Sequence, residues 1–118
     1  MVLLAGCATM DGGAPVVDAT PQPCDVTVTF GSFAMGVDQD LKARIQGVIT
    51  AETGVRDVEE RRWGREGESD LCIHAPAPVA DSLYTRIADL IPATSERAPT
   101  SVLHRDGRRK ASAWSNAR

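Results

Sequence analysis

Residues 26–30 read Val-Thr-Val-Thr-Phe, and residues 38–49 read Asp-Gln-Asp-Leu-Lys-Ala-Arg-Ile-Gln-Gly-Val-Ile. In the first run, apolar side chains alternate with threonines, which is typical of a strand with one buried face. The second run opens with an Asp that suits a helix N-cap. It then repeats apolar residues at helical spacing, at Leu41, Ile45, Val48 and Ile49. A strand followed by an amphipathic helix indicates a mixed α+β domain.

The chain after this helix continues the alternation of strands and helices. The pattern predicts strands over 55–63, 68–75 and 101–105, and a helix over 78–91. Gly54 is expected to take the left-handed conformation that ends the first helix. Residues 64–67 predict the turn between two strands, and Pro78 suits the first turn of the second helix. Asp106-Gly107 predicts a further turn that leads to a short extra strand ending near Trp114.

The resulting order, β-α-β-β-α-β, resembles the ferredoxin-like fold. That resemblance implies an antiparallel sheet with strand order 4-1-3-2 and both helices on one face. It puts the charged 55–63 strand and the short 101–105 strand at the two edges, where charge and shortness discourage pairing with other chains. We therefore expect the folded domain to span 24–105, followed by a basic tail over 106–118.

The composition fits one globular domain in a chain of 118 residues. With 42% hydrophobic and 25% charged residues, the chain is not expected to be wholly disordered. The net charge of -3 is too small to indicate nucleic acid as a partner. From Ser101 onward, however, five basic residues stand against one acid: Arg105, Arg108, Arg109, Lys110 and Arg118. Such a tail suits anionic lipid headgroups, and the alternative is a solvated tail that maintains solubility.

Residues 1–7, Met-Val-Leu-Leu-Ala-Gly-Cys, carry the most specific motif of the chain. Leu4-Ala5-Gly6-Cys7 resembles the lipobox of bacterial lipoproteins, in which small residues let a peptidase reach the backbone before a lipidated Cys. The resemblance implies a lipid anchor at Cys7, and two or more acyl chains would hold it stably at a membrane. Ala8, rather than Asp, implies anchoring in the outer membrane, with the domain in the periplasm.

This motif departs from a complete signal peptide, which has a basic region and an apolar run of about 7–15 residues. Only Val2 to Ala5 form an apolar run here, so residues 1–7 resemble a truncated signal peptide, or the start lies upstream of Met1. If Met1 is the true start, the alternative is a cytosolic α+β domain of unknown role. Residues 8–23 are rich in Gly and Pro and predict a flexible tether.

Cys24 and Cys72 form a candidate disulfide if Cys7 carries lipid, because exported proteins meet an oxidising compartment. The first and third strands would be adjacent and antiparallel, so both thiols would fall at the same end of the sheet. Strict alternation nevertheless assigns the two thiols to opposite faces, unless the first strand begins irregularly. A metal site at Cys72 and His74 would lack further ligands, because structural zinc takes four ligands and His104 is the only other histidine.

Two short segments carry the side chains best suited to binding, namely the 31–36 loop and the 63–68 hairpin. The expected topology puts both at the same end of the sheet. Aromatic, apolar and charged side chains would converge there: Phe33, Met35, Trp63, Arg65 and Glu66. Trp and Arg are enriched at binding hot spots. The alternative is structural, with glycines serving the turns, Phe33 and Met35 capping the core and the charges solvated.

No catalytic residues, metal or cofactor are predicted. Ser32, Asp70 and His74 are the residue types of a catalytic triad, but Ser32 and His74 belong to opposite ends of the expected sheet. The 31–36 loop lacks the spacing and the Lys-Ser or Lys-Thr pair of a phosphate-binding loop. We therefore expect a domain that binds rather than catalyses.

Two binding functions follow from these features. The first is a non-catalytic envelope lipoprotein whose domain binds a protein or wall component through the loop–hairpin end. The second is a peptidoglycan-binding module, because residues 28–33, Val-Thr-Phe-Gly-Ser-Phe, resemble the first-strand run of SPOR domains. Those domains share the βαββαβ order and occur in exported envelope proteins. The 70–74 strand lacks the Gly-Pro-Phe end that this family tends to show, which weakens the second hypothesis.

Overall fold

The computed structural model describes residues 23–114. The lipidation expected at Cys7, the 1–7 segment and the 8–22 part of the tether lie outside the described residues, as do residues 115–118. The described chain forms two helices, an antiparallel sheet of five strands and a separate pair of two-residue strands. The expected α+β class is confirmed. None of the helices in this part of the chain has the length and apolarity needed to cross a membrane.

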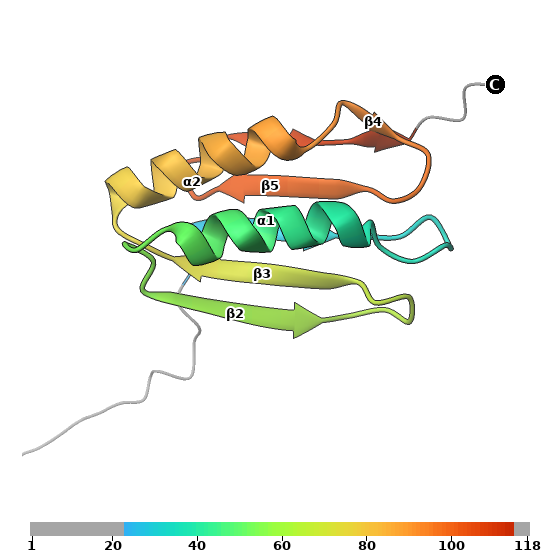
Figure 1. Cartoon of the computed structure of the whole chain (residues 1–118), viewed down its shortest axis with the longest axis horizontal. Coiled ribbons are helices and arrows are strands. Elements are labelled where there is room, and N and C mark those ends of the chain that lie inside the picture. Colours follow the sequence, from blue (N-terminus) through green and yellow to red (C-terminus); the bar gives the residue numbers. More distant parts are fainter. Residues whose placement is uncertain (1–22, 115–118) are drawn as a thin grey trace, which may run out of the picture.

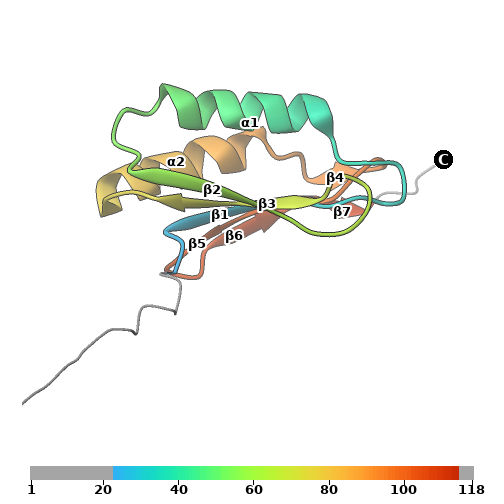
Figure 2. The ribbon, with the colours of Figure 1, turned by 90° about the horizontal axis from the view of Figure 1, so that it is seen from below.

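The elements alternate along the chain much as the sequence pattern predicts (Figure 1). Their bounds are β1 (Val26–Phe30), α1 (Gln39–Ala51), β2 (Asp57–Arg62), β3 (Ser69–His74), α2 (Ala77–Leu90), β4 (Thr94–Ser95), β5 (Thr100–His104), β6 (Arg109–Ala111) and β7 (Ala113–Trp114). The large sheet has the order β2-β3-β1-β5-β6, and all its neighbouring strands are antiparallel. Both helices lie on the same side of this sheet, so its other face is open (Figure 2).

The alternation of β1, the central strand, decides which sheet face is buried. Val26, Val28 and Phe30 are fully buried toward the helices, whereas Thr27 and Thr29 turn to the open face. β1 pairs with β3 on one side and with β5 on the other. The helices complete a mostly aliphatic core made of Val26, Val28, Phe30, Val37, Leu41, Ile45, Ile49, Leu71, Ile73, Ala80, Leu83, Ile87, Ile91 and Val102.

The expected first helix is confirmed in α1. Asp38 caps it, with Oδ1 accepting the Leu41 N–H at 3.1 Å. The left-handed role expected for Gly54 is wrong, because the helix ends at Ala51 and the glycines with positive φ lie elsewhere. A Cβ on Gly54 would lie only 2.5 Å from Cγ2 of Val79. The missing side chain therefore lets the chain after α1 pass close to α2.

The hairpin expected around residues 64–67 joins β2 to β3. Gly64 and Gly67 have φ values of 78° and 88°, which glycine adopts without steric cost. β2 is an edge strand with all six residues exposed, while β3 is interior and largely buried. The charges along β2 discourage another strand from pairing with its open edge.

The sheet continues past the boundary expected at Arg105. Gly107, with φ 104°, turns the chain so that β6 pairs with β5. From β6, the Lys110 ammonium donates to the Ala88 carbonyl of α2 at 2.8 Å. Residues 106–114 therefore belong to the fold rather than to a basic tail, and β5 is not an edge strand. The β5–β6 hairpin forms because it satisfies backbone groups of β5 that an edge position would leave unpaired.

Candidate functional site

The loop after β1 and the β2–β3 hairpin are neighbours at one end of the sheet, as the sequence predicts (Figure 1). A Cβ built on Gly36 would lie 3.8 Å from the Glu66 carbonyl oxygen, so the two backbones come close. Met35 is 70% exposed, and Arg65 and Glu66 are exposed beside it. This end of the molecule therefore offers one apolar side chain next to two opposite charges.

The two aromatic residues expected at this end contact side chains outside the 31–36 and 63–68 segments. Phe33 packs edge-to-face on Trp114, with ring centroids 4.2 Å apart. The indole of Trp63 donates from Nε1 to Asp70 Oδ1 at 3.0 Å. Asp70 points to the open face of the sheet, so this hydrogen bond draws the Trp63 ring onto that face. Trp63 remains 46% exposed there.

The open face carries the alternate side chains of every strand, and most are polar. They include Thr27 and Thr29 of β1, Asp70, Cys72 and His74 of β3, Asp57, Glu59 and Arg61 of β2, Ser101 and Leu103 of β5, and Arg109 of β6. The candidate surface predicted from the sequence leaves out all of these. The alternation of residues 26–30 could have indicated this surface, because its threonines mark a second accessible face of the sheet.

A hollow of about 200 Å³ lies on this face, and Trp63 forms part of its wall. Thr29 and Ser101 contribute hydroxyl groups, Pro99 an apolar surface, and Arg109 a guanidinium. Within residues 23–114, no carboxylate forms a salt bridge with Arg109. The hollow thus combines an aromatic ring, small polar groups and an available cation.

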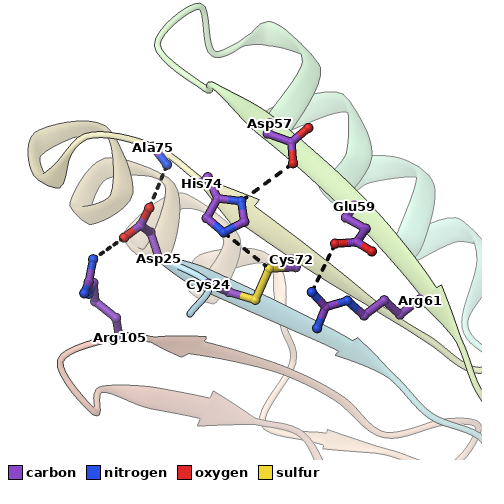
Figure 3. Close-up of a disulfide and its surroundings, with 9 residues drawn as sticks. All are labelled: Cys24, Asp25, Asp57, Glu59, Arg61, Cys72, His74, Ala75 and Arg105. Atoms are coloured by element: carbon purple, nitrogen blue, oxygen red, sulfur yellow. Dashed lines mark hydrogen bonds and ion pairs between the residues drawn. A yellow bond between two sulfur atoms is a disulfide. The ribbon is translucent and has the colours of Figure 1, made fainter. Parts of the chain in front are cut away.

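Cys24 and Cys72 form a disulfide toward the other end of the open face (Figure 3). Their Cα atoms are 5.2 Å apart. Strict alternation does not apply to Cys24, because this residue lies before β1 and the chain bends at Asp25 between them. His74 Nε2 lies 3.9 Å from Cys72 Sγ, and His74 Nδ1 lies 3.7 Å from Asp57 Oδ2. The disulfide therefore has an imidazole beside one of its sulfur atoms.

Two carboxylates near the disulfide are held in their charged form. Burial alone would raise the pKa of Asp25, but a backbone N–H at 2.9 Å and the Arg105 guanidinium at 2.6 Å outweigh it and lower this pKa. The hydrogen bond and charge of Arg61 lower the pKa of Glu59. The charge of His74 makes a smaller contribution in the same direction to the pKa of both.

No protein-family model matches this chain. No curated protein or solved structure matches it either. The chemistry of the described side chains is what indicates a function. Those side chains do not assemble the triad considered above, since Ser32 follows the end of β1 and His74 lies at the opposite end of the sheet, beside the start of β1.

Among the described residues, one cluster of metal-type ligands links α2 to the β5–β6 hairpin: Asp81, His104 and Asp106. His104 Nδ1 accepts the Asp106 N–H at 3.0 Å, so the imidazole proton sits on Nε2, which then has no lone pair for a metal. The Arg108 guanidinium already binds both carboxylates. The backbone N–H of Arg108 lowers the pKa of Asp106 most, and the guanidinium lowers it further. This cluster is a salt-bridge network that ties the hairpin to α2.

A second hollow, of about 360 Å³, lies between α1 and the edge strand β2. Its lining is mainly aliphatic, from Ile49, Val58 and Leu71, with Gln46 and Thr50 at its sides. No charged side chain or aromatic ring lines it, so it offers fewer specific contacts for a ligand than the open-face hollow does. The open-face hollow is the better candidate for recognition.

Proposed function

We propose that this protein is a non-catalytic binding module of the bacterial cell envelope that recognises wall glycan through the open face of its sheet. The observation that carries this proposal is the indole of Trp63, which is fixed by Asp70 beside the open-face hollow yet is 46% exposed. A ring oriented in this way is prepared for a ligand without losing further rotational freedom on binding.

The chemistry of the hollow suits a sugar with a carboxylate substituent. An exposed indole face packs against the apolar C–H face of a pyranose ring, as aromatic anchors do in binding sites. The hydroxyl groups of Thr29 and Ser101 match sugar hydroxyls. The guanidinium of Arg109 suits a carboxylate, such as that of the acidic amino sugar in bacterial wall glycan.

The fold and the predicted location at the outer membrane support the same proposal. We infer a ferredoxin-like fold from the order β2-β3-β1-β5, which agrees with the 4-1-3-2 order expected for such a domain, and β6 extends it by one strand. This arrangement supports the SPOR-like reading of residues 28–33. The lipobox ending at Cys7 supports a lipid anchor in the outer membrane, with the domain in the periplasm facing the wall.

A second candidate is protein binding at the loop–hairpin end, favoured by the 70% exposure of Met35 beside Arg65 and Glu66. An apolar side chain beside a charged pair is a common arrangement at protein interfaces. The two candidates use different tryptophans. Trp63 serves the open face, whereas Trp114 packs on Phe33 of the loop.

Co-sedimentation with purified peptidoglycan tests the proposal. The wild-type protein is expected to sediment, and Trp63→Ala is expected to weaken binding by about tenfold or more, as loss of an aromatic hot spot does. Trp114→Ala is the matched control, because Trp114 is also half-exposed but lies outside the hollow. Arg109→Gln should weaken binding, whereas Arg44→Gln on the exposed side of α1 should not.

The results separate the two candidates. Absence of wild-type sedimentation would exclude glycan recognition. Loss of binding in Trp114→Ala with retention in Trp63→Ala would move the site to the loop–hairpin end. Circular dichroism and unfolding curves of each variant show whether the domain remains folded.

A further inference from the structure

The side chains around the disulfide form a chain of contacts that a purely structural cross-link does not need (Figure 3). Cys72 and His74 are two residues apart on β3, so both point to the open face. Asp57 stands directly opposite His74 on β2. These contacts run from Asp57 Oδ2 to His74 Nδ1 over 3.7 Å, and from His74 Nε2 to Cys72 Sγ over 3.9 Å. An imidazole thus lies between a carboxylate and a disulfide sulfur.

The two sulfur atoms of the bond are not equivalent. Cys72 is interior to the sheet and 1% exposed, whereas Cys24 precedes β1 and is partly exposed. A thiolate from outside therefore reaches Cys24 more readily, and Cys72 becomes the leaving group. Burial disfavours a thiolate at Cys72, so the neighbouring positive charge decides how readily it leaves.

We propose that the Cys24–Cys72 disulfide is a thiol–disulfide exchange site, in which an incoming thiolate attacks Cys24 and His74 stabilises Cys72 as it departs. A bond forms between the incoming sulfur and Cys24 Sγ. The Cys24–Cys72 bond breaks, and its electron pair moves to Cys72 Sγ beside the imidazolium. A second thiol then attacks the mixed disulfide, so that two thiols are oxidised to one disulfide and Cys24 and Cys72 are reduced.

Acidic groups on two segments of the chain face His74. Asp57 and Glu59 approach from β2, and Asp25 approaches from the segment before β1. Cations on two neighbouring elements partly balance these acids, since Arg61 pairs with Glu59 and Arg105 pairs with Asp25. Asp57 is the carboxylate nearest to the imidazole, and it therefore acts as a positioning residue for His74.

Breaking this bond leaves the apolar core intact. Cys72 lies on the open face, outside the cluster of buried apolar side chains that joins the sheet to the helices. The sheet pairing of β1 with β3 also persists without the sulfur bond, because it rests on backbone hydrogen bonds. The reduced domain therefore keeps its core and sheet pairing at a lower stability, and this form completes the exchange.

Exchange kinetics with glutathione test the proposal on the full chain carrying Cys7→Ser, which removes a third thiol. The rate is divided by the concentration of glutathione thiolate at each pH, so that it reports on the leaving group. Near neutral pH, wild type is expected to exchange about fivefold to tenfold faster than His74→Asn. The ratio should fall toward one in alkaline solution, where imidazole is neutral.

Two further measurements keep the result independent of folding defects. His74→Lys retains a positive charge. Its normalised exchange rate should therefore stay high in the alkaline range, where the rate of wild type falls. Peptide mass spectrometry of the wild-type mixed disulfide should find glutathione on Cys24. Glutathione on Cys72, or equal normalised rates for wild type and His74→Asn at every pH, would overturn the proposal. Trp63→Ala should exchange normally, which separates this site from the proposed glycan site.

Discussion

At the scale of single residues, Gly54 shows how a missing side chain positions two elements. A Cβ there would meet Val79 Cγ2 at 2.5 Å, a distance that real contacts do not reach. Gly47, in the middle of α1, is the opposite case, because a Cβ there would meet nothing within 4 Å. The same substitution should therefore have opposite effects at the two positions.

We expect Gly54→Ala to lower the free energy of unfolding by about 1–3 kcal/mol, because the new methyl group pushes α2 from its place. Gly47→Ala should raise it by about 0.5–1 kcal/mol, since alanine costs less backbone entropy in a helix. Urea unfolding curves measure both effects. Adding Val79→Ala to Gly54→Ala should recover part of the loss, and a purely additive double variant would contradict the contact.

At the scale of elements, one carboxylate connects three parts of the sheet. Asp25, just before β1, accepts the Ala75 N–H after β3 with Oδ2, and the Arg105 guanidinium after β5 with Oδ1. These contacts lower the pKa of Asp25 despite its burial. A carboxyl group with a lowered folded-state pKa stabilises the fold above its unfolded pKa of about 3.9. That contribution is lost as the pH falls through the lower, folded-state pKa.

Asp25→Asn should therefore be less stable than wild type near neutral pH, and the difference should shrink as the pH falls below about 4. The free energy of unfolding, measured by urea titration between acidic and neutral pH, provides the comparison. Asp89→Asn changes an exposed carboxylate on α2 and is the matched control. It should leave the fall of the free energy of unfolding at acidic pH unchanged. A difference between wild type and Asp25→Asn that is constant with pH would exclude this role.

At the scale of the whole molecule, the domain compensates for a small core with a covalent cross-link. Among residues 23–114, Phe30 is the only aromatic side chain in the buried apolar cluster, and the other members are aliphatic. Domains of this size bury a limited share of their surface, so their stability margin is small. The Cys24–Cys72 disulfide spans 48 residues of sequence and restricts the unfolded chain accordingly.

Replacing both cysteines, in Cys24→Ser/Cys72→Ser, should lower the free energy of unfolding by about 4 kcal/mol in the chain-entropy account. Denaturant unfolding of the oxidised wild type and the double variant measures this loss. Reduction of wild type should produce a similar loss, whereas the double variant should not respond to reductant. An oxidised wild type that is insensitive to reductant would show that the bond carries no stability.

The sequence alone determined the elements and which face of each is apolar. The alternation of 26–30, the helical spacing of 41–49 and the cap at Asp38 are short-range properties of side chains and backbone, and the structure confirms them. Only the tertiary structure decided where β6 pairs, that Cys24 lies ahead of the strand alternation, and that Trp63 turns onto the open face. Each of these depends on partners supplied by other elements, and periodicity along one segment does not specify them.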